Sequence, residues 1–427
     1  MRTIISKSIE NPSEFKQQLL LWANQFREVV FLDSNSHNQK YSSYDCVLAV
    51  DALTSIKTDY EKAFEDLHQY QSQARDWIFG YLSYDLKNDI EDLKSDNFDG
   101  LHFSDLFFFQ PKKIFLLKEN LLEIQYLNMC DDEIEEDFEA INKCSVFSFQ
   151  SSKIIINQRI SKENYISKVS KVLEHIHRGD IYEANFCMEF YAENVQIDPL
   201  EIYRKLNQIS EPPFAVYFKN YKHYLLSASP ERYLKKQDEQ VISQPIKGTS
   251  KRSSDLIEDE ASKNDLQNNQ KERSENIMIV DLVRNDLSKT ATKGSVEVEE
   301  LCQIYTFKQV HQMISTIVSK VEHTTSPIEI LKTTFPMGSM TGAPKISAMT
   351  IIENLEETKR GLYSGAVGYF TPNGDFDFNV VIRSILYNSD NQYLSFSVGS
   401  AITSLSEPEN EYEECLLKAK AMFEVLS

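Results

Sequence analysis

Residues 271–289, KERSENIMIVDLVRNDLSK, have the periodicity of an amphipathic helix with one carboxylate on its apolar side. At about 100° per residue, Glu275 falls on the same stripe as Ile279 and Leu282. A carboxylate in that position is costly unless it is paired or binds a cation. We therefore expect Glu275 either to bond to the backbone or to Arg284, or to serve as a functional ligand.

The closing helix, predicted over residues 408–426, repeats this pattern. Glu411, Glu414 and Lys418 share one face, which continues with apolar residues toward the C-terminus. An ion pair between Glu414 and Lys418, four residues apart, is the simpler explanation. The alternative is functional: carboxylates from two separate helices that leave room for waters and substrate oxygens would suit Mg²⁺.

The rest of the chain reads as a mixture of α and β segments. Before residue 150, strand-like stretches such as REVVFLDS and DCVLAVDA alternate with helical ones such as PSEFKQQLLLWANQF. After it come a helix that should stop at Gly179, a series of strands, and the two helices described above. We place a boundary near residue 150, between an N-terminal segment 1–150 and a larger segment 151–427.

Three polar passages interrupt this pattern. Residues 87–100 and 130–145 are acidic and loop-like, and residues 253–269, SSDLIEDEASKNDLQNN, are predicted to form a mobile loop.

Composition excludes several classes of protein. The chain of 427 residues has 45 Lys and Arg against 65 Asp and Glu, with no strongly basic block, which argues against nucleic-acid binding. No signal-peptide core and no run of roughly 18 apolar residues is present, so we expect no membrane segment and a cytoplasmic protein. Its six cysteines form no CxxC pair and its eight histidines form no HExxH motif, so neither zinc nor disulfides are expected.

Four further residues stand in unusual settings. Glu231 closes the strand of SASPERYL, where it either caps a backbone N–H or acts chemically. The glycines of FPMGSMTGAPK, residues 335–345, would let backbone N–H groups approach an anion, with the charge of Lys345 nearby. Arg383 lies in an apolar strand and should meet a carboxylate. Lys247, in QPIKGTSKR, is either a surface charge or an amine held in a pocket.

Together these motifs resemble the chorismate-utilising enzymes, which include anthranilate synthase component I, aminodeoxychorismate synthase component I and the isochorismate synthases. The resemblance covers about residues 158–427. It implies an intertwined α+β body in which two packed β-sheets are flanked by helices, with the active site in a cleft. The motifs that carry it, in this order and spacing, are SASPERYL (227–234), QPIKGTSKR (244–252), KERSENIMIVDLVRNDLSK (271–289), MGSMTGAPK (337–345), RGLYSGAVGYF (360–370) and NVVIRS (379–384).

The resemblance also implies roles for individual residues. Glu275 and Glu414 would bind Mg²⁺, with Glu411 as a neighbouring candidate ligand. Glu231 would be the general acid that protonates the departing C4 hydroxyl, which requires a raised pKa. The residues that would bind the substrate are Tyr363, Arg383, Gly248, Thr249, Thr341, Gly342, Gly399 and Lys418.

Lys247 distinguishes the subfamilies. Anthranilate synthases resemble PIAGT at this place, whereas aminodeoxychorismate synthases resemble PIKGT, the sequence found here. A lysine desolvated in a pocket loses proton affinity and becomes a nucleophile. It would add at C2 of Mg²⁺-bound chorismate, and ammonia would then enter at C4 and expel it. Isochorismate synthases have a lysine where this chain has Glu183, which argues against isochorismate formation.

Three departures from the family pattern leave other functions open. Gln312 replaces the second residue of a histidine pair, Ala401 replaces a glycine, and Gln244 replaces an arginine. The alternatives are a chorismate-binding homologue without turnover, which Gln312 and Ala401 favour, and an anthranilate synthase component I, which Lys247 argues against. No cysteine is followed by glycine as in a glutaminase, so a separate glutamine amidotransferase subunit is expected to supply the ammonia.

Overall fold

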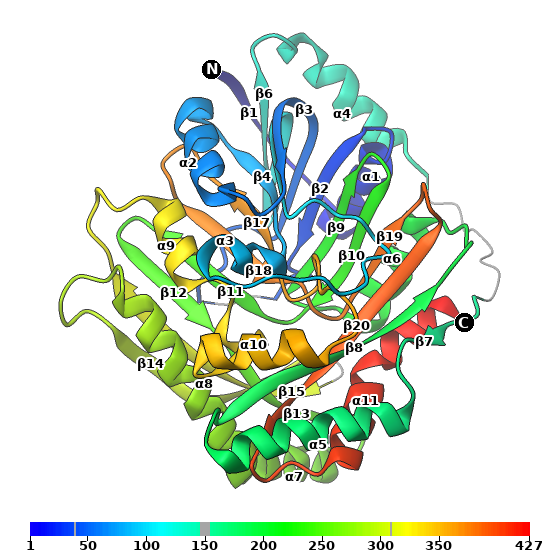
Figure 1. The fold of residues 1–427 in the computed structure, drawn as a ribbon. Helices are drawn as coiled ribbons and strands as arrows, with labels where there is room; N and C mark the ends of the chain where they lie inside the picture. The colour runs from blue at the N-terminus through cyan, green and yellow to red at the C-terminus, as the bar shows by residue number, and fades with distance from the viewer. Residues whose placement is uncertain (38–39, 146–153, 308–309) are drawn as a thin grey trace.

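The computed structural model describes residues 1–37, 40–145, 154–307 and 310–427. Its named strands pair antiparallel in two rows that join at β5 (Figure 1). The first row runs, in spatial order, β1 Arg2–Ser8, β6 Leu121–Leu127, β5 Leu106–Lys118, β3 Cys46–Thr58, β2 Glu28–Asp33, β9 Phe214–Asn220, β10 His223–Ser229, β19 Ser384–Asn388, β20 Tyr393–Thr403 and β8 Glu183–Ala192.

The second row starts at Leu106–Phe109 of β5, where β4 pairs on the side opposite β3. It runs β4 Ile78–Leu82, β17 Ala366–Phe370, β18 Phe376–Val380, β11 Arg232–Gln237, β12 Gln240–Gln244 and β15 Val310–Lys320, with β13 Ile246–Lys251 and β14 Glu297–Thr306 also paired to β15. Two short strands, β7 Asn157–Gln158 and β16 Gly342–Ala343, pair with β8.

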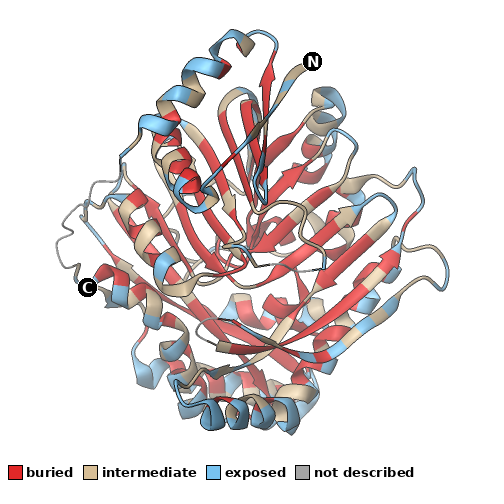
Figure 2. Ribbon diagram, turned by 180° about the vertical axis from the view of Figure 1, so that it is seen from behind, coloured by how far each residue is buried: buried red, intermediate tan, exposed pale blue. Residues whose placement is uncertain are grey.

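Successive side chains along a strand point to opposite faces of the sheet. The apolar side chains on the facing sides pack the two rows against each other. Phe218 of β9 in the first row packs edge-on against Tyr81 of β4 in the second, with ring centroids 5.3 Å apart. Figure 2 shows the strands buried along most of their length, while exposed residues gather on the helices. This arrangement confirms the predicted α+β fold with two packed sheets.

Helices cover the outer faces of both rows. One apolar core lies between the two rows. Another lies between the first row and α1 Pro12–Ala23, α5 Lys162–Arg178, α6 Pro199–Ser210 and α11 Pro408–Leu426. On the second row, α7 Leu256–Asn268 and α8 Gln270–Ser288 pack against β13, β14 and β15. The remaining helices longer than one turn are α2 Ala63–Ala74, α4 Ile134–Lys143, α9 Pro327–Thr334 and α10 Lys345–Leu355.

Two loop predictions are wrong. Residues 253–269 contain α7, because Asp255 caps its N-terminus by accepting from the N–H groups of Ile257 and Glu258. Residues 130–145 contain α4, whose apolar residues were hidden among acidic ones. The predicted stop of α5 is confirmed: Gly179 has a φ of 88°, a left-handed conformation that favours glycine.

The strands before and after residue 150 form one sheet system. β2 pairs with β9, and β4 pairs with β17. The proposed boundary itself lies in residues 146–153, outside the described residues, and the division into two segments stays a prediction. No helix in the described parts of the chain is long and apolar enough to span a membrane.

Candidate active site

The candidate site lies where the sheet rows meet α8 and α11. It collects the start of β8, the turn between β10 and β11, the beginning of β13, residues 338–345 and the N-terminal halves of both helices. These segments are far apart in the sequence, so only the fold brings their side chains together.

Glu231 is a buried carboxylate at the turn after β10. Its Oε1 accepts a hydrogen bond from Ser339 Oγ at 2.7 Å, and its side chain is 4% exposed. Burial raises the pKa of Glu231 to about 7, against the opposing effects of Ser339 and of the nearby Lys247 ammonium. A carboxyl group that is partly protonated near neutral pH is suited to act as a general acid, and the general-acid role that the resemblance implies for Glu231 stays a prediction.

Lys247 points into the protein and not into solvent. Its Nζ donates to Glu183 Oε1 at 2.9 Å, and the two side chains are 10% and 1% exposed. Burial favours the neutral amine, yet the carboxylates of Glu183, Glu275 and Glu231 outweigh it and raise the pKa of Lys247 above its ordinary value. The expectation that burial alone would lower that pKa is therefore wrong, because sequence reasoning did not place three acids around the amine.

Residues 338–345, which follow α9, approach the site through their backbone. A Cβ on Gly342 would lie 2.1 Å from the carbonyl oxygen of Glu183, so only glycine fits there. Thr341 is fully buried, and its carbonyl accepts from the N–H of Asn185 at 2.8 Å. The segment is thus fixed against β8, next to the Glu183 that holds Lys247.

A buried ion pair between Arg360 and Glu356 also stabilises residues 338–345 against β8. Arg360 donates from Nε to Glu356 Oε2 at 2.9 Å, and its other nitrogens reach the carbonyl oxygens of Met340 and Asn185, both at 2.6 Å. Glu356 Oε1 accepts from the N–H of Cys187 at 2.8 Å. One guanidinium and one carboxylate therefore tie residues 338–345 to β8.

Arg383 and Lys418 lie together on the α11 side. The guanidinium of Arg383 donates to the carbonyl of Lys418 at 3.3 Å, and Lys418 Nζ donates to the carbonyl of Gly399 at 2.8 Å. Within the described residues Arg383 forms no ion pair, and burial lowers its pKa. A partly buried cation without a carboxylate partner is suited to bind an anionic ligand.

Tyr363 and Gly399 lie beside these cations. The Sγ of Cys187 is 3.8 Å from the Tyr363 hydroxyl, and a Cβ on Gly399 would lie 2.5 Å from that same sulfur. The surroundings of position 399 are therefore packed closely enough to require glycine there.

Gly248 and Thr249 directly follow Lys247 along β13. Gly248 has a φ of 86°, so a side chain there would be strained, and its missing Cβ faces Glu272 at 3.0 Å. Beside Thr249 is a cavity of about 430 Å³, bounded by β13, α7 and the start of α8.

Glu275 and Glu411 present buried oxygens toward the same lysine. Lys271 Nζ lies 3.1 Å from Glu411 Oε1 and 3.9 Å from Glu275 Oε1. Within the described residues, Glu275 Oε1 and Glu411 Oε2 have no hydrogen-bond partner, although the two residues are only 7% and 1% exposed. The alternative pairing of Glu275 with Arg284 is wrong, since Arg284 bonds to Asp281 on the exposed side of α8.

These orphaned oxygens fit a cation. Mg²⁺ is usually bound by one or two carboxylates together with waters and substrate oxygens. The described residues contain no group of three His, Cys, Asp or Glu side chains gathered as in a preformed metal site. Two carboxylates that converge on one point therefore suit Mg²⁺ better than a metal that needs an all-protein cage.

Glu414 makes the simpler of its two predicted contacts. Its Oε1 lies 2.6 Å from Lys418 Nζ, one helical turn further along α11. Burial acts to raise the pKa of Glu414, but the Lys418 ammonium outweighs burial and lowers that pKa below its ordinary value. The predicted ion pair is confirmed, and a role of Glu414 as a metal ligand stays a prediction.

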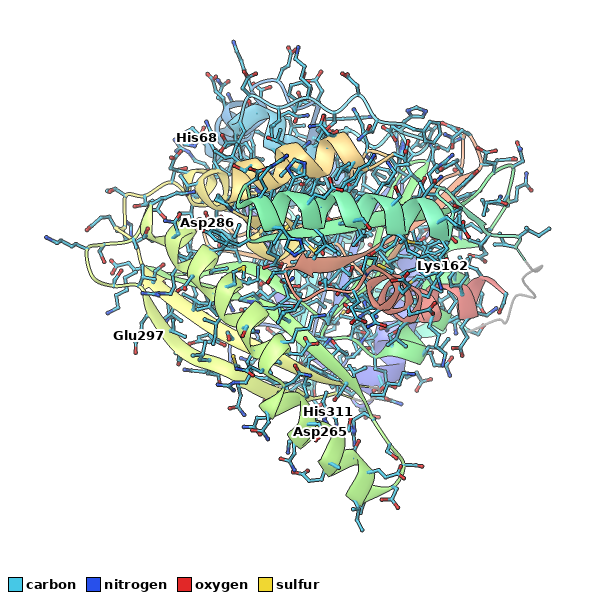
Figure 3. All side chains as sticks on the ribbon, turned by 60° about the horizontal axis from the view of Figure 1, so that its bottom comes forward. His68, Lys162, Asp265, Asp286, Glu297 and His311 are labelled. Carbon is cyan, nitrogen blue, oxygen red and sulfur yellow. The ribbon has the colours of Figure 1, made fainter. Side chains whose placement is uncertain are left out.

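The structure shows what surrounds two of the departures, Gln312 and Gln244. His311 faces α7, where its Nε2 is 3.1 Å from Asp259 Oδ1 (Figure 3). Its Nδ1 is 2.9 Å from Thr306 Oγ1 of β14. It therefore does not substitute for the histidine that Gln312 replaces. Gln244 accepts from Arg232 Nη1 at 2.6 Å and so supports β11.

Sequence reasoning missed three functional candidates. Glu183 was noted only as a replaced lysine, although it bonds to Lys247. Ser339, the donor to Glu231, was one of several small residues in a glycine-rich motif. Lys271 had a usable signal, because it precedes Glu275 by four residues on a helix.

Comparison with known proteins identifies the family of the chain. A family model described as chorismate binding enzyme matches residues 15–424. The chain is 31% identical over 381 residues to aminodeoxychorismate synthase component 1 of Bacillus subtilis, covering 86% of this chain and 79% of that protein. It is 34% identical over 349 residues to anthranilate synthase component 1 of Saccharolobus solfataricus, covering 81% and 79%.

A plant relative is longer. The chloroplastic aminodeoxychorismate synthase of Arabidopsis thaliana is 41% identical over 264 residues, which are 61% of this chain and 28% of that protein. The chain thus spans less than a third of that relative's length.

Solved structures confirm the fold. Anthranilate synthase component I from Streptococcus pneumoniae superposes with a TM-score of 0.78 at 23% identity, covering 91% of this chain and 94% of that one. The menaquinone-specific isochorismate synthase MenF from Escherichia coli gives 0.77 at 15% identity, covering 100% and 95%. The chain belongs to the chorismate binding enzyme family.

Proposed function

We propose that the chain aminates chorismate with ammonia to give 4-amino-4-deoxychorismate, the precursor of p-aminobenzoate, through a covalent adduct on Lys247. One observation carries this proposal: Lys247 is a buried amine bonded to Glu183, and its charge also interacts with that of Glu231. A surface lysine would have neither the enclosure nor the acidic neighbours.

The first chemical step joins Lys247 to the ring. Glu183 accepts a proton from Nζ, and the neutral amine adds at C2 of chorismate. The ring double bonds shift as the C–O bond at C4 breaks, and Glu231 protonates the departing hydroxyl, which leaves as water. The hydrogen bonds recorded at Glu183 and Ser339 place both carboxyl groups for these transfers.

The second step reverses the addition with a different nucleophile. Ammonia adds at C4, the double bonds shift back, and the C2–N bond breaks with its electron pair returning to Lys247 Nζ. The added nitrogen then gives its extra proton to Glu231, and Glu183 returns its proton to Lys247 Nζ, so the product amine is neutral and both carboxyl groups and the lysine are regenerated. The lysine thus acts as a covalent catalyst that divides one substitution into two.

Substrate carboxylates would be held by positive and N–H groups of this chain. Arg383 offers a guanidinium that has no other carboxylate partner in the described residues, and Lys418 supplies charge beside it. Glu275, Glu411 and Glu414 would hold Mg²⁺, with the last still paired to Lys418. When bound, Mg²⁺ would draw electron density from the substrate carboxylate and so make the ring more receptive to a nucleophile.

Ammonia would come from a separate glutaminase subunit. The name of the Bacillus subtilis relative, a component 1, implies such a second component for that protein. Excess ammonium should replace the partner in the test tube. A cytoplasmic location also stays a prediction.

Anthranilate formation is the second candidate. The similarity to anthranilate synthase component 1 of Saccharolobus solfataricus favours it, while Lys247 disfavours it because direct attack of ammonia at C2 needs no lysine.

The product separates the two candidates. Purified protein is incubated with chorismate, Mg²⁺ and excess ammonium at mildly alkaline pH, and the products are identified by chromatography and mass spectrometry. A 4-amino-4-deoxychorismate peak that a lyase converts to p-aminobenzoate supports the proposal. Anthranilate would assign the chain to the second candidate, and no turnover would favour a binding homologue.

A further inference from the structure

Lys271 occupies a position that a metal ion would also need. It lies in the first turn of α8, four residues before Glu275, and its ammonium contacts Glu411 of α11 at 3.1 Å and Glu275 at 3.9 Å. One cation thus bridges two helices by contacting two of the carboxylates assigned above to a divalent metal.

The two carboxylates need a cation in this position. Both are at least nine-tenths buried, and each has one oxygen without a hydrogen-bond partner among the described residues. Two buried anions side by side repel each other, and an unpaired buried charge is strongly destabilising. The Lys271 ammonium contacts both carboxylates and the more distant Lys247 ammonium also acts on Glu275, whereas a divalent cation would compensate both charges at contact distance.

Lys271 is also free to leave. Its side chain is 35% exposed, against 2% for Glu411 and 10% for Glu275. A lysine at a helix start has a flexible four-carbon stem that can turn its head into solvent without unwinding the helix. The cavity of about 430 Å³ beside Asn269 and Glu272 provides solvent next to this turn of α8.

We propose that the Lys271 ammonium is an internal counter-ion, which holds the cation position between Glu275 and Glu411 and is exchanged for Mg²⁺ when the metal binds. The inference rests on the Mg²⁺ site of the proposed function and specifies how that site is kept assembled. Binding is then a competition, so the apparent affinity for Mg²⁺ is lower than that of the free carboxylates.

Removal of the competitor should tighten metal binding. In Lys271→Ala, the Kd for Mg²⁺ measured by calorimetry on metal-stripped protein should fall about tenfold, as expected when a half-buried ion pair no longer has to be broken. Lys271→Arg keeps the charge and should bind Mg²⁺ like the unaltered chain. Lys143→Ala, which removes an exposed pair to Glu139, serves as the matched control and should change nothing.

Chemical labelling tests the displacement directly. The acetylation rate of Lys271, read by peptide mass spectrometry, should rise several-fold when Mg²⁺ replaces EDTA, while that of Lys143 stays constant. Weaker or equal Mg²⁺ binding by Lys271→Ala, or a labelling rate unaffected by the metal, would overturn the exchange and leave the metal site standing. No Mg²⁺ binding by any of the proteins would overturn both the exchange and the metal site, whatever product the chain makes.

Discussion

Lys247 keeps its proton where burial alone would remove it. Three carboxylates surround the amine, and only Glu183 bonds to it directly. In the proposed mechanism Lys247 is therefore held in its charged form until a proton leaves, and its reactivity would depend on its acidic neighbours as much as on its enclosure.

Glu183→Gln should separate these effects. With its bonded carboxylate gone, the pKa of Lys247 falls, so the limb of the pH profile on which kcat/KM rises should move to lower pH. At the same time kcat should fall about a hundredfold, because the amide accepts no proton. Measurement of kcat/KM from pH 6 to 10 checks both, and a limb that stays in place would contradict the role of Glu183.

Glu231 should limit activity at the other end of the pH range. A general acid works protonated, and the pKa of Glu231 is raised to about 7, so the limb that this group controls should fall as pH rises through about 7. Glu231→Gln should remove that limb and lower kcat by about 10²-fold or more. A falling limb retained in the variant would assign it to another group.

The same shift makes a stability prediction. Because the folded pKa of Glu231 lies above its ordinary value, folding loses stability as pH rises from about 4.5 to about 7. Glu231→Gln should therefore match the unaltered chain at pH 4 and exceed it at pH 8, by about 1–3 kcal/mol in the free energy of unfolding. Urea titrations at both pH values test this, and lower stability of the variant at pH 8 would contradict it.

Residue types revealed much of this site from the sequence alone. Glu275 and Arg383 are notable because charges in apolar segments need a reason, Glu231 because it closes a strand, and Lys247 because its motif resembles PIKGT. The sequence did not reveal the acids around Lys247, since Glu183, Glu231 and Glu275 come from three different elements and meet only in the folded chain.

At the scale of elements, residues 338–345 and β8 are held together by one ion pair. Arg360 and Glu356 are each less than nine per cent exposed, and they satisfy the backbone of both segments. The contacts of Arg360 and Glu356 therefore both fix residues 338–345 against β8 and contribute to the stability of the fold.

Arg360→Met should destabilise the fold by about 3–5 kcal/mol, because it leaves Glu356 charged and buried without a partner. Arg284→Met, which removes an exposed pair to Asp281, should cost less than about 0.5 kcal/mol. Urea titrations of both variants give the comparison, and similar losses would show that the buried pair has no special role.

Element prediction succeeded where periodicity was strong and failed where charges hid it. The apolar strands and α5, α8 and α11 were predicted at the right places. α7 was mistaken for a mobile loop because polar residues dominate it, while its Asp255 cap and its packing through Leu266 hold it in place.

At the scale of the whole molecule, the N-terminal segment is part of the common sheet. β2 and β4 each pair with a strand that follows residue 154. The overall α+β class followed from the sequence, but these pairings join residues more than 180 positions apart, and no local pattern predicts them.

This topology predicts that the chain unfolds as one unit. Both tryptophans, Trp22 and Trp77, lie before residue 150, so their fluorescence reports on the N-terminal segment, while far-ultraviolet circular dichroism reports on the entire chain. The two urea transitions should coincide. Loss of fluorescence at a clearly lower urea concentration would show that the N-terminal segment unfolds independently.

The central claim is that Lys247 forms the covalent adduct that directs ammonia to C4. The most direct test compares 4-amination by the unaltered chain and by Lys247→Ala, with Lys236→Ala, which removes a lysine paired with Asp375, as control. The account predicts at least a thousandfold lower rate for Lys247→Ala, about 4 kcal/mol in activation free energy, and a normal rate for the control. Formation of 4-amino-4-deoxychorismate by Lys247→Ala at the unaltered rate would contradict it.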